Sequence, residues 1–541
     1  MDVTAWQNAL QAWIEAIGSR HVETGAAALA AAEKATFATN QRIPVILRPG
    51  SRDEVAHCLR IANSFRCPVY PVSTGKNWGY GSRVPARTQT ALLDLSRLNR
   101  IVEYNEELAF VTVEPGVTQR QLSAYLAERK SSLWMDATGS SPDASLIGNT
   151  LERGFGHTPY GEHFNHAAAL EVVLPNGDCI ATGFARFPNA NTGPLFRWGV
   201  GPSLDGLFSQ SGFGIVTRMS IQLMPAPEYF QAFFFRCDSY DQLGAVLEVL
   251  RPLRLNGTLP SSVHIANDYR ILSGLRQFPW ELTNGQTPLL PAALPALRRS
   301  LNIGAWNASG GLYGSKEQVA VARRLLRHAL RGKVSRLTFL DDRALRLTIQ
   351  YARPLQFFTS WDLSRAAEML PPVYGLLKGI PTAHALRGAY WRKKSYPAVL
   401  DPDLDHCGLL WHAPILPATP EDAARLHDTA SRILLEDGFE PMMTLSLVNG
   451  RAFAAVISIC YDRDVPDEDA RAMACYRRLV DSCRDLGYYS YRLGVQSSAE
   501  MDGPPAYADL LRRLKAAVDP NHILAPGRYQ PPASASPPAR G

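Results

Sequence analysis

The pattern of apolar and polar positions near the start of the chain predicts a strand–helix–strand unit that runs into a long polar loop. Residues 45–48 form a short apolar run, and Ser51 is placed to cap a helix whose apolar positions recur on one face. Residues 68–72 form a second strand and lead directly into "STGKNWGYGS" (73–82). In βαβ units, ligands bind beyond the carboxyl ends of the strands. The loop at 73–82 is therefore the first candidate binding site.

Up to about residue 225, short strands alternate with helices. Helices are predicted at 2–17 and 24–35, three strand-like runs and then a helix are predicted within 91–129, and Pro175-Asn176-Gly177 predicts a hairpin turn. These short elements predict the first of two lobes.

The pattern changes at about residue 226, where longer helical and strand segments begin that continue to about residue 490. A last helix stops at Asp519-Pro520, and the Pro/Ala/Ser-rich tail at 529–541 is predicted to be disordered. At 541 residues the chain exceeds what one hydrophobic core usually serves. The two stretches are therefore predicted to be separate lobes of an α+β protein.

Composition and charge narrow the class of protein only a little. The chain is 46% hydrophobic and 20% charged, which is typical of a globular protein, and its net charge of +6 is spread along the sequence. The densest basic cluster, "RGAYWRKK" (387–394), is short, and no motif that reads RNA or DNA accompanies it. Nucleic acid is therefore not expected as a partner.

The cysteines and the N-terminal segment predict a cytoplasmic protein. The eight cysteines form no CxxC pair and follow no metal-ligand spacing, so we expect thiols in a reducing compartment and no metal. The first twenty residues carry acidic side chains and lack a continuous apolar core, which favours an amphipathic helix over a secretion signal. No apolar run is long enough for a transmembrane helix, so no membrane partner is expected.

The loop at 73–82 has the composition of an anion-binding loop. Backbone N–H groups left free by tight turns form a concave anion site, and small residues let a phosphate come close. The loop matches neither GxxxxGK[ST] nor GxGxxG, which excludes the P-loop and the ordinary dinucleotide fingerprint. On spacing alone, a pyrophosphate site and a long structural turn are equal alternatives, and Lys76 fits a solvated loop charge better than a phosphate partner.

Several long motifs resemble one known family. They are "PVYPVSTGKNWGYGS", "GNTLERGFGHTPYGEHF", "DGLFSQSGFGIVTRM", "GLLWHAP" and the closing "GYYSYRLGVQ … AAVDPNHILAPGR". In this order they resemble the vanillyl-alcohol oxidase / p-cresol methylhydroxylase (PCMH) flavoproteins, over about residues 40 to 528. The resemblance implies a PCMH-type FAD-binding domain of two α+β subdomains at 1–225 and a cap over the substrate at 226–490. It also implies that a segment at 491–528 returns to the FAD domain.

The resemblance implies that FAD is the cofactor and that the loop at 73–82 wraps its pyrophosphate. The residues that it places at the cofactor are Ser73, Thr74, Gly75, Lys76, Asn77, Gly79, Ser82, Gly139, Ser140, Gly148, Asn149 and Ile215. Many relatives bind the flavin covalently through a His, and alignment on Pro414 puts Leu409 at that position. Tyr396 and His406 are nearby nucleophiles, but neither aligns cleanly. We therefore expect non-covalent FAD and leave covalent attachment open.

Three residues match the family's phenol-binding site: Tyr80 in "NWGYG", and Tyr491 with Arg492 in "YSYRLG". A para-substituted phenol has a pKa of about 10, so its phenolate has to be stabilised before the ring oxygen can push charge toward the benzylic carbon. A guanidinium and two Tyr hydroxyls supply directional donors for this purpose. The resemblance implies an FAD-dependent oxidase or dehydrogenase that takes a benzylic hydride through a p-quinone methide. Hydroxylation, alcohol oxidation and desaturation are the expected outcomes.

The sequence leaves the general base unassigned. His157 in "GFGHTPYG" stands where relatives often carry Tyr, and it fits an acid–base residue or a neutral hydrogen-bonding replacement equally well. The family's oxidases carry an acid near flavin N5, where alignment puts Ser140, and Asp143 lies three residues further on.

Two other functions remain open at this point. In one, the same cavity oxidises a non-phenolic alcohol, an amine or a biosynthetic intermediate, as the departures at Ser140, His157 and Leu409 allow. In the other, the chain is a flavin-binding or flavin-free scaffold without turnover, whose expected sign would be loss of the phenol-binding residues. The partners that we expect are a small aromatic substrate, cytochrome c or another electron acceptor and, from the family, a second copy in a homodimer.

Overall fold

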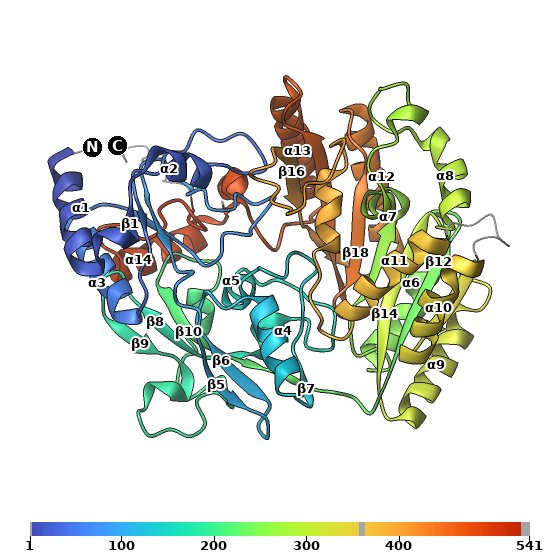
Figure 1. Cartoon of the computed structure of the whole chain (residues 1–541), viewed down its shortest axis with the longest axis horizontal. Helices are drawn as coiled ribbons and strands as arrows, with labels where there is room; N and C mark the ends of the chain where they lie inside the picture. The colour runs from blue at the N-terminus through green and yellow to red at the C-terminus, as the bar shows by residue number, and fades with distance from the viewer. Residues whose placement is uncertain (1–2, 356–362, 502, 532–541) are drawn as a thin grey trace.

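The computed structural model describes residues 3–355, 363–501 and 503–531, and these residues form two lobes (Figure 1). The first lobe runs to β11 (Met224–Pro225), and the second lobe, here called the cap, begins at β12 (Tyr229–Cys237). The change of pattern predicted at about 226 falls between these two strands. None of the helices in the described ranges is both long and apolar enough to cross a bilayer.

Within the described residues, the first lobe contains a four-stranded sheet, a five-stranded sheet and a two-stranded sheet. The four-stranded sheet has the order β1-β2-β4-β3, with β2, β4 and β3 parallel to one another, and the five-stranded sheet, β5-β6-β10-β8-β9, is antiparallel. The strands are β1 (Val22–Glu23), β2 (Ile46–Leu47), β3 (Val69–Val72), β4 (Ala91–Asp94), β5 (Ile101–Asn105), β6 (Phe110–Val113), β8 (Ala167–Val173), β9 (Cys179–Ala181) and β10 (Ile215–Gln222); β7 (Leu133–Trp134) pairs with β11. The three strand-like runs predicted within 91–129 therefore divide between two sheets, β4 in one and β5 and β6 in the other.

Amphipathic helices cover these sheets. The Ser51 hydroxyl accepts a hydrogen bond from the Glu54 N–H at 3.1 Å and begins α3 (Arg52–Phe65), as its capping position predicts. Because α3 joins the parallel strands β2 and β3, the predicted βαβ unit is confirmed, and β3 delivers the loop at 73–82. The other helices of this lobe are α1 (Val3–Ile17), α2 (Ala26–Ala32), α4 (Gln119–Glu128) and α5 (Leu146–Leu151).

The cap is built on one eight-stranded antiparallel sheet. Its order is β15-β12-β14-β13-β18-β19-β16, with β17 beside β19. The further strands are β13 (Val263–Asn267), β14 (Trp306–Gly314), β15 (Arg336–Leu340), β16 (Cys407–His412), β17 (Ile415–Pro417), β18 (Met442–Leu447) and β19 (Ala452–Asp462).

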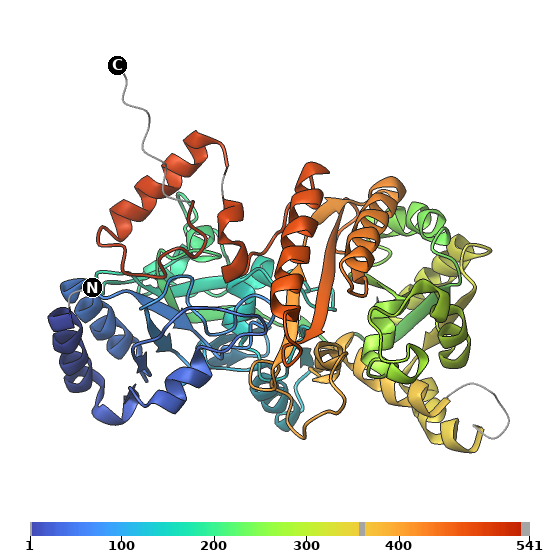
Figure 2. The same cartoon turned by 90° about the horizontal axis from the view of Figure 1, so that it is seen from above.

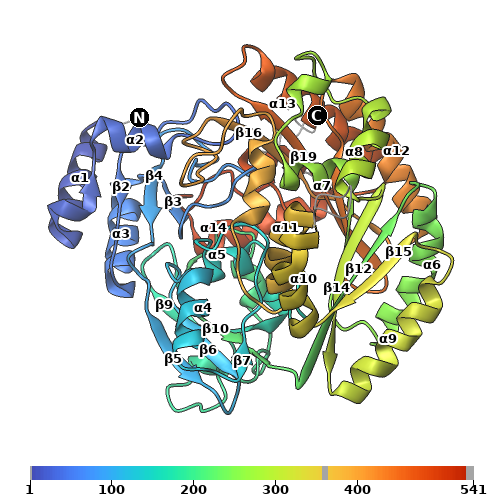
Figure 3. The same cartoon turned by 45° about the vertical axis from the view of Figure 1, so that its right-hand side comes forward.

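Helices cover both faces of the cap sheet. Figure 3 shows α6, α9 and α12 on the face that is turned away from the first lobe. The cap helices are α6 (Gln242–Leu255), α7 (Asp268–Leu275), α8 (Leu294–Leu301), α9 (Lys316–Leu330), α10 (Asp342–Leu355), α11 (Leu363–Leu376), α12 (Pro420–Glu436) and α13 (Glu468–Asp485).

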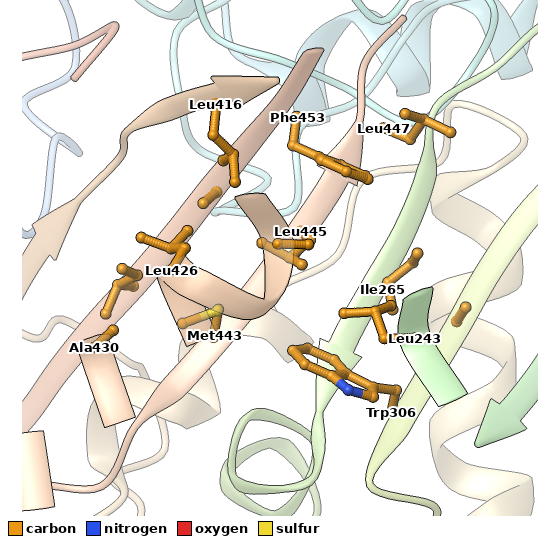
Figure 4. Close-up of a cluster of buried hydrophobic side chains, with 14 of the residues drawn as sticks. Leu243, Ile265, Trp306, Leu416, Leu426, Ala430, Met443, Leu445, Leu447 and Phe453 are labelled. Atoms are coloured by element: carbon orange, nitrogen blue, oxygen red, sulfur yellow. The ribbon is translucent and has the colours of Figure 1, made fainter. Parts of the chain in front are cut away.

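The largest hydrophobic core lies between the cap sheet and the helices α6, α9, α12 and α13 (Figure 4). Trp306 of β14 and Leu445 of β18 meet Leu243 of α6 and Leu426 of α12 there, and all four are buried. Full burial of each large apolar side chain contributes about 1.5–3 kcal/mol. The core therefore makes the sheet a rigid support for the side chains on its other face.

The C-terminal segment returns to the first lobe, as the red ribbon in Figure 2 shows. Beyond α14 (Pro505–Val518), the Val69 N–H donates to the Ile523 carbonyl and the Ala525 N–H donates to the Val69 carbonyl, both at 2.8 Å. Most of the tail predicted to be disordered, 532–541, lies outside the described residues. Tyr529 is buried, so the packed chain continues beyond residue 528.

Candidate active site

One large cavity lies where the first lobe, the cap and the C-terminal segment meet. Its volume is about 440 Å³, and its walls come from the loop after β3, residues 138–157, β10, the cap strands β16, β18 and β19, and residues 491–529. Segments that are far apart in the sequence therefore share one site.

The loop at 73–82 brings free backbone donors to this cavity. Within the described residues, the amide N–H groups of residues 74–77 have no hydrogen-bond partner in the protein. The Thr74 hydroxyl faces the next segment of the wall and accepts from the Ser145 N–H at 3.1 Å. Successive unpaired N–H groups on a turn of small residues fit a bound pyrophosphate, so this cradle fits FAD.

Two glycines are required for this cradle. Gly79 has a φ of +77°, and a Cβ there would lie 2.9 Å from the Trp411 ring. A Cβ at Gly148 would collide with the Ser73 hydroxyl. Any larger residue at either position would push the two walls apart.

All of the predicted cofactor-binding residues except Gly79 line the cavity: Ser73, Thr74, Gly75, Lys76, Asn77, Ser82, Gly139, Ser140, Gly148, Asn149 and Ile215. Gly79 supports the loop from behind, and its N–H donates to the Thr36 hydroxyl at 3.0 Å. The Lys76 ammonium forms an ion pair with Asp401 of the cap at 2.9 Å. Its charge therefore ties the loop to the cap.

Tyr80, Tyr491 and Arg492, the residues predicted to bind a phenol, line the same cavity. The Arg492 guanidinium carbon lies 4.6 Å from the centroid of the Tyr80 ring, and Arg492 Nη2 donates to Asn77 Oδ1 at 2.6 Å. Burial raises the pKa of Tyr80 well above its ordinary value; it also raises the pKa of Tyr491, where the Arg492 charge opposes the shift. Both hydroxyls are therefore protonated, hydrogen-bond-donating groups at neutral pH.

A buried charge network, which the sequence did not reveal, holds Arg492. Glu152 Oε2 lies 3.3 Å from Arg492 Nε, while Glu152 also accepts from Arg528 at 2.9 Å and from the Tyr529 hydroxyl at 2.6 Å. Burial alone would raise the pKa of Glu152, but the charges of Arg528 and Arg492 hold it below its ordinary value. Two guanidinium groups and one carboxylate leave a net positive charge at this end of the cavity.

His157 faces a second histidine, His264 of β13, which the sequence analysis missed. The ring centroids are 4.3 Å apart; His157 Nδ1 lies 3.1 Å from the Ala137 carbonyl and His264 Nδ1 lies 2.8 Å from the Ser446 hydroxyl. Burial lowers the pKa of both rings, and that of His264 falls well below its ordinary value. His264 Nε2 is buried and has no partner within the described residues. The two rings are therefore neutral at pH 7.

The cavity wall has no free carboxylate within the described residues. Ser140 lines the cavity, but Asp143 lies outside it and forms an ion pair with Arg120 at 2.7 Å. Glu152 is the one acidic residue of the described wall, and its charge is paired. The wall offers neutral imidazole nitrogens and hydroxyls instead of a carboxylate base.

The residues considered for covalent flavin attachment lie in different places. Leu409 lines the cavity. Tyr396 is on the surface, and His406 is exposed and pairs with Asp464 at 3.1 Å. Neither Tyr396 nor His406 lines the cavity wall.

The chain is similar to known flavoproteins. Residues 43–183 match the family model described as the FAD binding domain. The chain is 46% identical over 539 residues to the 1'-carboxy-chondrochloren decarboxylase of Chondromyces crocatus, and the match covers 98% of each chain.

Two further relatives are more distant. The chain is 32% identical over 482 residues to the 4-cresol dehydrogenase (hydroxylating) flavoprotein subunit of Pseudomonas putida, covering 88% of this chain and 85% of that one. A solved 4-ethylphenol oxidase from Gulosibacter chungangensis, in an isoeugenol complex, has the same fold, with a TM-score of 0.89 and 28% identity over 98% of both chains.

Proposed function

Because the chain belongs to the vanillyl-alcohol oxidase / p-cresol methylhydroxylase family of FAD-dependent oxidoreductases, we propose that it takes a hydride from the benzylic carbon of a para-substituted phenol. The observation that carries this assignment is the convergence of Tyr80, Tyr491 and Arg492 on one cavity. The same cavity contains the free N–H groups that suit the pyrophosphate of FAD.

These side chains supply what the phenol oxygen needs. The two protonated tyrosines donate hydrogen bonds, and Arg492 adds a permanent charge with directional donors. The net positive charge that remains beside Glu152 favours the phenolate over the phenol. A deprotonated ring oxygen pushes electron density toward the para carbon and so lowers the barrier to hydride loss. Bound FAD supplies the two-electron acceptor.

A decarboxylative outcome is a second candidate, favoured by the relative named as 1'-carboxy-chondrochloren decarboxylase. Loss of the hydride turns the substrate into a p-quinone methide, which draws electrons toward its ring. If the next carbon carries a carboxylate, the bond to it can break, so that CO₂ leaves and the electron pair forms an alkene. Hydroxylation and desaturation need a base, whereas this step needs none. It therefore suits a wall whose single carboxylate, Glu152, is already paired.

The electron acceptor and the assembly are part of the same proposal. One relative is named as a flavoprotein subunit and another as an oxidase, so we include both a carrier protein such as cytochrome c and oxygen as acceptors. A homodimer and non-covalent FAD complete the proposal. The eight free cysteines, seven of them buried, support a reducing cytoplasmic location.

Anaerobic titration of the FAD-loaded protein with 4-cresol, vanillyl alcohol and eugenol tests the proposal. At least one of these phenols is expected to bleach the flavin absorption band. If none does, while a non-phenolic alcohol or amine bleaches it, the phenol assignment is wrong. A purified chain that takes up no flavin would instead be a scaffold.

A further inference from the structure

Four cationic side chains line the cavity in the described part of the chain. Three of them are paired with carboxylates: Lys76 with Asp401, and Arg492 and Arg528 with Glu152. The fourth is Arg270, in the first turn of α7 in the cap.

No protein group neutralises the Arg270 guanidinium within the described residues. Its backbone N–H donates to Asn267 Oδ1 and its carbonyl accepts from the Ser273 hydroxyl, but its side chain makes no hydrogen bond or ion pair there. Burial lowers the pKa of Arg270, and the Cys460 thiol is the one ionisable group that acts against this shift. A cationic side chain thus faces the cavity without a counter-charge.

The surrounding chain makes room for this side chain. A Cβ at Gly388, in the short helix η8 (His384–Tyr390), would lie 2.7 Å from Arg270 Nη1. Glycine at this position therefore provides the space that the guanidinium occupies.

Elsewhere in the cap, a buried arginine has its charge paired with two carboxylates. Arg392 forms ion pairs with Glu440 and Glu468, each at 3.1 Å. This pairing is the usual arrangement for a structural charge, because an unpaired buried ion is strongly disfavoured. Arg270 lacks such a pairing. Since arginine stays protonated, an anion that enters the cavity would supply the missing counter-charge.

We propose that Arg270 binds a carboxylate on the side chain of the substrate. The inference rests on the proposed function, which puts the phenol oxygen at Arg492 and the pyrophosphate at residues 74–77 of the first lobe. Arg270 belongs to neither group and lies on the cap wall with Leu386 and Ala389. The substrate class is then a para-substituted phenol whose side chain ends in, or carries, a carboxylate.

The chemistry balances for 3-(4-hydroxyphenyl)propanoate as a probe. The substrate releases its phenolic proton to water and loses a hydride from its benzylic carbon to bound FAD. The C–C bond to the carboxylate then breaks, CO₂ leaves, and the electron pair forms the vinyl double bond and restores the phenolate, which takes the proton back. The products are 4-vinylphenol, CO₂ and reduced FAD. Since the ion pair with Arg270 is lost as CO₂ forms, Arg270 is a binding residue and does not speed the bond cleavage.

The test compares this propanoate with 4-ethylphenol, which has a hydrogen in place of the carboxylate. The variant Arg270→Gln should raise the KM for the propanoate by about 10- to 100-fold, change kcat much less, and leave the KM for 4-ethylphenol nearly unchanged. Arg387→Gln is the matched control, because Arg387 lies outside the cavity wall and pairs with Glu368 at 2.9 Å. Flavin content and the melting temperature of each variant report whether it is folded.

Each other outcome has a distinct meaning. If Arg270→Gln weakens both phenols equally, the side chain acts on the flavin or the fold and the carboxylate assignment is wrong. If it weakens neither, the assignment is also wrong while the proposed oxidation stands. If neither phenol reduces the wild-type flavin, the proposed oxidation fails, and dissociation constants from flavin difference spectra of wild type and variant still decide whether Arg270 binds the carboxylate.

Discussion

The Arg492 side chain contacts the cavity, an aromatic ring and a buried carboxylate at once. Its planar guanidinium lies against Tyr80, donates to Asn77 and faces Glu152. Lysine has the same charge but offers a point charge on a flexible stem, so it cannot make these contacts together.

We therefore expect Arg492→Lys to lower kcat/KM for the phenol substrate by about 10²–10³-fold, as loss of a transition-state donor does in other enzymes. Stopped-flow reduction of the flavin gives this ratio, and flavin content shows that the cofactor is still bound. Arg432→Lys, on the exposed side of α12, is the control and should match wild type. An unchanged rate in Arg492→Lys would contradict the role given to this residue.

The two cavity histidines give a prediction about pH. Burial lowers the pKa of His157 and His264, so both are already deprotonated at the ordinary His value of 6.5 and stay neutral as the pH rises. The kcat/KM profile should therefore show no step centred near 6.5, and protonation of the pair should reduce activity only at more acidic pH. A step at 6.5 that disappears in His157→Gln would show that this ring titrates normally and acts as an acid or base.

Among the elements, a segment of the cap is tied to the loop at 73–82 by two contacts. Lys76 pairs with Asp401, and the Ser82 hydroxyl donates to Asp403 Oδ1 at 2.9 Å. Burial, helped by the charge of Asp401, raises the pKa of Asp403 to about 7. The folded protein thus keeps a proton on Asp403 between about pH 4 and 7 that the unfolded chain has released.

This shift makes the folded protein less stable as pH rises through that window. One such proton changes the free energy of unfolding by at most about 1.4 kcal/mol per pH unit. Asp403→Asn should therefore flatten the fall in stability between pH 5 and 7, as measured by urea unfolding at each pH. If the variant and the wild type lose stability with the same slope, Asp403 does not carry the proton.

Local sequence predicts some of these elements but not how all of their strands pair. The βαβ unit and its loop were found because a cap, an apolar face and two short strands are all local signals within residues 45–82. The sequence did not predict that β4 joins one sheet while β5 and β6 join another. Strand pairing depends on partners such as β10 that are distant in sequence.

For the whole molecule, the site could be predicted only where long motifs mark it. Tyr80, Tyr491 and Arg492 stand in such motifs and do line one cavity. The partners that tune them were missed: Glu152 and Arg528 are 376 positions apart, and no spacing rule links them. Arg270 and His264 were missed as well, since single residues in a strand and a helix give no signal until the fold brings them to the cavity.

For the whole holoprotein we predict that FAD is bound without a covalent link. Leu409 cannot form a bond to the flavin, and the nucleophiles near it in sequence lie away from the cavity. Acid precipitation should therefore leave the protein pellet colourless and release FAD into the supernatant. A yellow pellet would show a covalent link through another residue.

The proposed function requires the cavity to activate a phenol by holding its deprotonated oxygen. Rapid anaerobic mixing of the FAD-loaded protein with 4-cresol and, separately, with its O-methyl ether tests this claim most directly. We expect 4-cresol to bleach the flavin and the ether, which cannot form a phenolate, to leave it oxidised. Equal bleaching by both compounds would contradict phenolate activation. So would a flavin that neither 4-cresol nor any other para-substituted phenol bleaches.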